Sequence, residues 1–175
     1  RLNPTKGKSA AERLLEVTQD ELEYMLVENS DEPYADKIAA NIMKEIKKGN
    51  KIDTTTKLRV IIENTLEFLP NNNEKKDIIK KTCQRVFQAL RIDVNSEFEV
   101  LESFLNNLLE IMAPGGRIAI LTFHSGEDRI VKKAFKSYYK QGIYSEIAEE
   151  VIRPSREECY QNSRAHSTKL RWAKK

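Results

Sequence analysis

The sequence predicts an α/β unit joined to an all-helical unit. One apolar run of strand length, residues 117–123, follows a turn at Pro114 and leads into an amphipathic segment of helical period. Nearly all of residues 9–90 has helical period as well. A continuous apolar strand is typical of parallel sheets covered on both faces, and a helix, a strand and a helix in succession are typical of α/β folds.

Composition limits the classes of protein to consider. The 175 residues allow one domain or two small ones, and the net charge of +3 is too small to indicate nucleic acid by itself. No apolar run approaches the roughly 20 residues of a membrane-spanning helix, and no stretch has the pattern of a signal peptide, so we expect no membrane partner. Cys83 and Cys159 lie far apart without a CxxC spacing or a histidine cluster. This favours reduced thiols in a cytoplasmic protein and predicts no metal site.

Capping signals divide the helical region. Ser9 and Thr18, each followed three residues later by a glutamate, have the spacing of a capping box. The five helices expected here begin near Ser9, Thr18, Asp31, Thr54 and Glu74. Amphipathic helices joined by short loops can bury their apolar faces against one another, so we expect residues 5–84 to form one helical domain.

The second domain is expected over residues 85–175. Its elements are, in order, a helix over 85–95 that could also be extended, a helix from Ser96, the strand 117–123, a helix from Ser125, a strand over 147–152, a short helix from Ser155 and a strand over 168–173. A sheet that buries its central strand on both faces needs about five strands. Because this sequence supplies about three, further chain or a partner is expected to complete the sheet. The opening at Arg1, without methionine, favours a fragment or a processed product.

Five separated blocks carry a resemblance to a known family. They are residues 3–12, 87–95, 114–117, 124–132 and 164–171. In order and spacing they resemble the MraW/RsmH family, S-adenosylmethionine-dependent methyltransferases that act on the exocyclic 4-amino group of a cytidine in small-subunit ribosomal RNA. The resemblance implies that residues 5–84 are the family's inserted helical domain, and that residues 85–175 are the C-terminal part of a Rossmann-like methyltransferase sheet.

The resemblance also places the cofactor mostly outside this chain. The family carries the glycine-rich loop and acidic residues that hold S-adenosyl-L-methionine upstream of Asn3-Pro4. Here no GxG follows a predicted strand, and Gly115-Gly116 precedes one, so the cofactor-binding residues are unknown. The implied partner is small-subunit ribosomal RNA or the small ribosomal subunit. A homodimer or a missing N-terminal segment would complete the sheet.

Candidate site residues follow from strand ends and from the family blocks. In open α/β sheets ligands bind at the carboxyl ends of strands, so His124, Asp128 and Arg129 are the catalytic candidates. In the functional interpretation, His124 and a carboxylate orient a flipped cytosine and Arg129 contacts phosphate. In the structural interpretation, the segment is only a helix start capped by Ser125, with a surface ion pair. The substrate-binding candidates are Asn3, Pro4, Lys6, Arg91, Ser125, Glu127, Arg164, Ser167, Lys169 and Arg171.

Some candidate residues also suit a purely structural role, and some positions differ from the family's usual residues. Lys169 suits RNA phosphate, but edge strands also carry lysine against aggregation. Gly126, Ser163 and His166 stand where the family usually has leucine, proline and arginine, and we interpret Gly126 as a change in loop flexibility. The alternative functions are a non-catalytic RNA-binding or scaffold remnant and one half of a split enzyme. The reading frame upstream of Arg1 would distinguish them.

Overall fold

The computed structural model describes residues 7–175, and the chain divides into two compact units, the first ending at Glu97 and the second beginning at Phe98. Each unit has a hydrophobic core of its own. Asn3, Pro4 and Lys6 lie outside the described residues.

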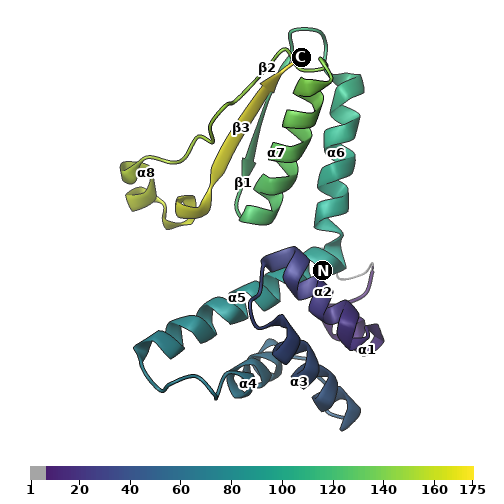
Figure 1. Ribbon diagram of the computed structural model, residues 1–175, viewed down its shortest axis with the longest axis vertical. Helices are drawn as coiled ribbons and strands as arrows, with labels where there is room; N and C mark the ends of the chain where they lie inside the picture. Colours follow the sequence, from purple (N-terminus) through teal and green to yellow (C-terminus); the bar gives the residue numbers. More distant parts are fainter. Residues whose placement is uncertain (1–6) are drawn as a thin grey trace. The chain divides into compact units, whose positions relative to one another are not determined.

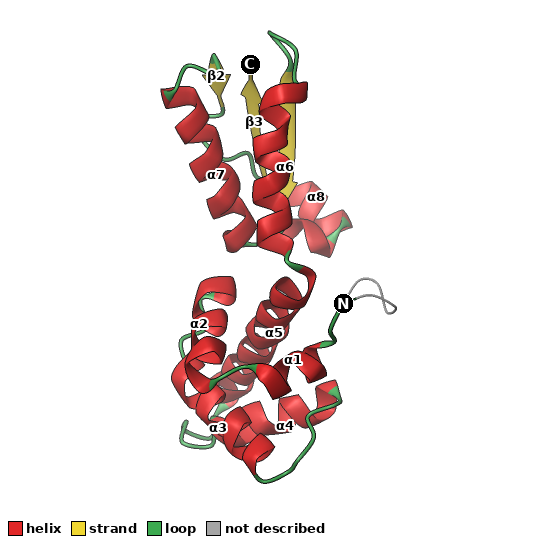
Figure 2. Cartoon of the chain, turned by 90° about the vertical axis from the view of Figure 1, so that its right-hand side faces the viewer, coloured by secondary structure: helices red, strands yellow, loops and turns green. Residues whose placement is uncertain are grey.

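Helices alone build the first unit (Figure 2). They are α1 (Ala10–Glu16), α2 (Gln19–Ser30), α3 (Ala35–Lys47), α4 (Thr55–Thr65) and α5 (Asn73–Asn95). The capping boxes predicted at Ser9 and Thr18 are both present, and Thr54 accepts a hydrogen bond from the backbone N–H of Lys57 as the cap of α4. Local capping signals therefore set the starts of these helices, and their apolar faces pack together into one core.

Helix α5 runs without a break through the position where we expected the domain boundary. The segment 85–95, which could have been extended, is the second half of this helix, so the helical interpretation is confirmed. Val86, Ala89 and Leu90 are buried in the core of the helical unit. These side chains tie the end of α5 to the first unit, and the boundary expected between residues 84 and 85 therefore falls inside a packed helix.

The second unit is a small antiparallel sheet with helices (Figure 1). Its elements are α6 (Glu97–Ile111), β1 (Arg117–Thr122), α7 (Ser125–Lys140), β2 (Glu146–Ile147), α8 (Arg156–Gln161), the 3-10 helix η1 (Ser163–Ser167) and β3 (Lys169–Lys174). The strand order is β1-β3-β2, and both pairings are antiparallel. Thr122, the last residue of β1, pairs with Lys169, the first of β3, so the end of β1 and the start of β3 meet at one end of the sheet.

Two expectations about this sheet need correction. The strand through Ile120 is not buried on both faces. Helices α6 and α7 pack on one face only, over Ile118, Ile120 and Ala173, while Leu121 on the other face is half exposed (Figure 2). The strand expected over 147–152 is also shorter. Past Ile147 the ladder consists of one hydrogen bond from Ala148 to Trp172 and an isolated bridge between Ile152 and Leu170.

The strand count is as expected, but β1 lies at the edge of the sheet formed by the described residues, and its partner β3 runs antiparallel. A local apolar pattern does not encode the direction of the neighbouring strand, which explains the difference. Within residues 7–175 no helix is both long and apolar enough to cross a bilayer.

Candidate functional site

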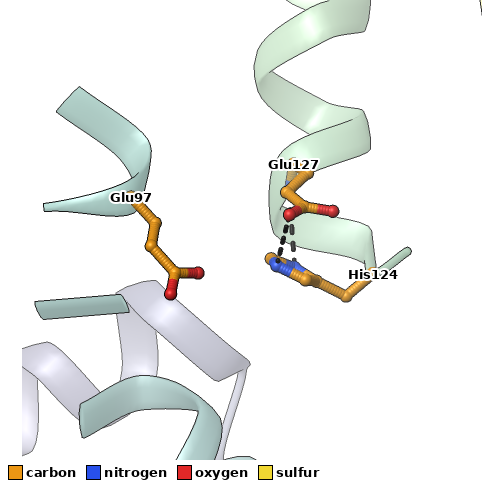
Figure 3. A group of neighbouring side chains, drawn as sticks. All are labelled: Glu97, His124 and Glu127. Atoms are coloured by element: carbon orange, nitrogen blue, oxygen red, sulfur yellow. Dashed lines mark hydrogen bonds and ion pairs between the residues drawn. The ribbon is translucent and has the colours of Figure 1, made fainter. Parts of the chain in front are cut away.

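The first turn of α7 begins at a histidine cap. The backbone N–H of Glu127 donates to Nδ1 of His124 over 3.4 Å, and the backbone N–H of Phe123 donates to Oε2 of Glu127 over 2.8 Å. Figure 3 shows the imidazole and the Glu127 carboxylate side by side. We expected Ser125 to cap this helix, but Ser125 is its exposed first residue. The cap lies one residue earlier because the imidazole nitrogen takes the acceptor role that we assigned to the hydroxyl.

The other ring nitrogen of His124 is buried. Because Nδ1 accepts a hydrogen bond, the neutral imidazole carries its proton on Nε2. Nε2 lies 3.3 Å from Oε1 of Glu127, yet it makes no hydrogen bond of normal geometry within residues 7–175. A buried polar atom without such a bond is rare, and a ligand atom is one way to satisfy it. Burial raises the pKa of Glu127, but the adjacent His124 and the hydrogen bond from the Phe123 backbone outweigh it, so the pKa lies below its ordinary value.

A buried ion cluster lies one residue further along α7. Arg171 donates from Nε to Oδ1 of Asp128 over 2.7 Å and from Nη2 to Oδ2 over 3.2 Å. Nζ of Lys169 lies 3.6 Å from Oδ2 of the same carboxylate. Burial raises the pKa of Asp128, but the hydrogen bonds and charge of Arg171, helped by Lys169, lower it more, so it lies below its ordinary value. Asp128 is therefore a carboxylate, bound on both oxygens by cations.

This cluster fixes the start of α7 to the start of β3. Asp128 and Arg171 are both buried, and a bidentate pair of an arginine and a carboxylate holds its two elements in a defined orientation. The hydroxyl of Thr122 donates to the carbonyl of Lys169 over 3.1 Å and joins the end of β1 to the same place. His124 is thus held between Thr122 and Asp128, two positions that cannot shift independently.

Other predicted residues lie apart from this cluster. Arg129, next to Asp128, is exposed and lines a cavity of about 370 Å³ between α6 and α7. Arg164 and Ser167 are exposed on η1, immediately before β3. Arg91 belongs to the helical unit, where its guanidinium binds both carboxylate oxygens of Glu97. The structure therefore brings together His124 with Glu127, and Asp128 with Lys169 and Arg171.

Gly126 is part of a helix and of a packed contact, which corrects its interpretation as a flexible loop residue. It is buried in the first turn of α7. A Cβ at this position would lie 2.6 Å from Cζ of Phe98 and 3.2 Å from Nδ1 of His124. The Phe98 ring occupies the space of the missing side chain and also lies beside His124, with ring centroids 6.0 Å apart.

We find no cofactor cradle among residues 7–175. A glycine-rich turn that holds a nucleotide follows the carboxyl end of a strand. The first glycine after β1 is Gly126, which lies in a helix, and the Phe98 ring occupies the space beside it. Gly115, with a positive φ of 77°, precedes β1. The described residues therefore do not fit S-adenosyl-L-methionine on their own, and none is assigned to it.

Tyr160 and Arg156 on α8 were not among the predicted site residues. Tyr160 is 93% exposed and lies four residues after Arg156, so both side chains are on one side of the helix. A signal was present in the sequence, because Arg156–Gln161 has no apolar stripe to bury Tyr160.

Ionisable side chains from the start of α7 and the start of β3 gather beyond the carboxyl end of β1. The model of the MraW methylase family matches residues 1–175, and the chain belongs to this family.

Curated relatives have closely similar sequences. The chain is 64% identical over 173 residues to ribosomal RNA small subunit methyltransferase H 1 of Lachnoclostridium phytofermentans, covering 99% of this chain and 47% of that protein. It is 65% identical over 173 residues to the protein of the same name from Agathobacter rectalis, covering 99% of this chain and 49% of the relative. Identity to ribosomal RNA small subunit methyltransferase H of Elusimicrobium minutum is 39% over 168 residues, which are 96% of this chain and 54% of that protein. The chain spans about half the length of these relatives.

Proposed function

We propose that the protein transfers a methyl group from S-adenosyl-L-methionine to the 4-amino group of a cytidine in small-subunit ribosomal RNA. The observation that carries this proposal is the similarity, over 99% of the chain, to proteins named ribosomal RNA small subunit methyltransferase H. In this proposal the chain contributes the inserted helical domain and the C-terminal part of a Rossmann-like sheet to a protein of its relatives' length. The polar cluster at the end of β1 supports this assignment.

His124 is proposed to contact the target base through Nε2. The neutral tautomer offers Nε2–H as a donor, which suits the N3 or O2 acceptor of cytosine and leaves the 4-amino group free. S-adenosyl-L-methionine, when bound, supplies an electrophilic methyl group. The task of this chain is then to hold the amine in position, and positioning can account for much of the rate of such a reaction.

Asp128 and Arg171 are proposed as positioning residues and not as acid or base. Their charges satisfy each other in a buried pair that holds the neighbouring His124 at the strand end. Arg129, Arg164 and Lys169 are proposed to face RNA phosphates, with Ser125 and Ser167 as hydroxyl donors.

The proposed partner is the small ribosomal subunit or its RNA, in the cytoplasm. The free edge of β1 is proposed to pair with a further strand, from another segment of the protein or from a second copy, since an unpaired edge is a template for another strand.

The test uses the protein encoded by the complete reading frame in which this sequence lies. We expect it to transfer labelled methyl groups to small-subunit RNA, and mass spectrometry of the digested RNA to identify N4-methylcytidine. Transfer to another atom would overturn the cytidine assignment, and no transfer would favour the non-catalytic RNA-binding alternative.

Variants of His124 separate capping from base contact. Asparagine caps helices well but lacks Nε2, so His124→Asn should keep the thermal midpoint while kcat/KM falls roughly five- to tenfold, about the value of one hydrogen bond. His124→Ala removes both the cap and the contact and should lower both quantities. An unchanged kcat/KM in His124→Asn would show that Nε2 does not contact the base.

A further inference from the structure

Helix α8 is ordered without contributing to a core. None of its residues is buried, and Tyr160 has the highest exposed fraction of the large apolar side chains within residues 7–175. The helix is nevertheless fixed locally, because Ser155 caps it by accepting a hydrogen bond from the backbone N–H of Glu158 over 3.1 Å. The next element, η1, is anchored by the buried Ala165. Tyr160 therefore contributes to no core, and its ring is accessible to a partner.

A cavity opens beside this tyrosine. It has a volume of about 460 Å³ and is lined by Pro154, Ser155, Arg156, Cys159, Tyr160 and His166. No carboxylate lines it, although α8 carries Glu157 and Glu158. No ion pair is formed by Arg156 within the described part of the chain, so its guanidinium can bind an anion. The cavity thus combines an aromatic ring, a guanidinium and an imidazole.

The cavity also lies at the functional end of the sheet. Residues 163–167 lead directly into Lys169, which pairs with Thr122, and His124 follows Thr122 by two residues. The start of β3 and the end of β1 therefore carry the cavity and His124 on the same end of one sheet. A single strand of RNA bound across this end of the sheet could reach both the cavity and His124.

We propose that this cavity binds a single-stranded nucleotide of the RNA substrate near the target, with its base stacked on Tyr160 and its phosphate at Arg156 and His166. An aromatic face beside a guanidinium and an imidazole, without a carboxylate, suits an unpaired nucleotide, since bases stack on aromatic rings and arginine binds phosphate. The inference rests on the proposed function for its RNA substrate. It adds Arg156 and Tyr160, which lie outside the five family blocks and are not among the predicted site residues.

The experiment compares three variants of the full-length protein in binding to a single-stranded small-subunit RNA fragment, followed by fluorescence anisotropy at several salt concentrations. Tyr160→Ala should weaken binding about fivefold or more with an unchanged salt slope, because stacking is not ionic. Arg156→Ala should lower the log-log salt slope by about 0.7, the contribution of one phosphate contact to a single strand. Tyr24→Ala is the matched control, since Tyr24 is 68% exposed but lies on α2 among Asp20, Glu21 and Glu23. It should leave the affinity unchanged.

A conservative variant and a stability measurement complete the design. Tyr160→Phe keeps the ring and should bind as the unaltered protein does, which supports stacking. If Tyr160→Ala binds RNA with unchanged affinity while the unaltered protein methylates RNA, the inference is overturned and the proposed function stands. If Tyr160→Ala lowers the thermal midpoint and leaves the affinity unchanged, Tyr160 packs against protein and the inference fails. If RNA binding depends on Tyr160 but no methyl transfer occurs, the cavity assignment stands and the proposed function fails.

Discussion

The Asp128 carboxylate has little access to water and is neutralised by charges from β3. Its side chain is 12% exposed and that of Arg171 is 9% exposed, so neither charge can be solvated if its partner is lost. A buried ion pair adds little net stability, but removal of one member leaves the other uncompensated. The pair therefore acts as a fixed connection between α7 and β3, and its value is in position more than in energy.

Substitution of the carboxylate should expose this asymmetry. Asp128→Asn keeps the shape but leaves the Arg171 guanidinium buried without a counter-charge, so we expect a loss of about 3 kcal/mol in the free energy of unfolding. Urea titration measures it. The control is Glu146→Gln, which removes the partner of Lys174 from a pair at the surface and should change little. Equal effects of the two variants would show that Asp128 and Arg171 are not coupled.

Acid should remove the same contribution. The pKa of Asp128 is lower in the folded chain than its ordinary value near 3.9, so its contribution to stability is complete above that value and is lost as pH falls through the folded pKa. The difference in unfolding free energy between the unaltered chain and Asp128→Asn should therefore shrink below about pH 4. A difference that stays constant down to pH 2 would contradict the lowered pKa.

Residue patterns revealed the alternation in β3 but not its orientation. Lys169 and Arg171 share one face, with Leu170 and Trp172 on the other. We expected Lys169 and Arg171 to contact RNA. In the structure Arg171 is buried under α7, because Asp128 supplies its counter-charge. A carboxylate 43 residues away in the sequence decides which face is covered, and no local pattern contains that information.

Between elements, α6 and α7 meet through a glycine and an aromatic ring. Gly126 leaves room for Phe98, and the ring contacts the imidazole that caps α7. The glycine on α7 is thus paired with a large side chain on α6. Sequence alone showed the glycine but could not show the ring that fills its space.

Leucine at position 126 should destabilise the chain unless the side chain at position 98 is made smaller. Gly126→Leu places Cβ 2.6 Å from Phe98, closer than packed atoms allow, and we expect a loss of about 1 to 3 kcal/mol in unfolding free energy. Gly126→Leu with Phe98→Ala should recover part of this loss. Thermal unfolding of both single variants and the double variant forms a cycle, and strictly additive losses would rule out this contact.

At the scale of the whole molecule, the chain holds a helical unit and a sheet unit, each with its own core, and the two differ in how far the sequence predicted them. Capping boxes and helical period predicted nearly all helices of the helical unit, because each cap is encoded within a few residues. The sheet was harder to predict because strand direction and edge position depend on distant segments. The sequence predicted about three strands, and among residues 7–175 the sheet has three, with β1 at its edge.

Hydrogen exchange on the whole chain should reflect this difference. Residues 33–69 include helices whose buried side chains Ile38, Ile42 and Ile62 have no exposed surface, whereas β1 has a partner strand on one side only among residues 7–175. We expect the amides of residues 33–69 to be better protected than those of 117–123, since local opening is cheapest where few contacts hold the backbone. Stronger protection of 117–123 would mean that the edge of β1 is covered. Repeating the measurement at tenfold lower protein concentration would then identify the cover: protection that falls on dilution comes from a second copy, and protection that does not comes from the chain itself.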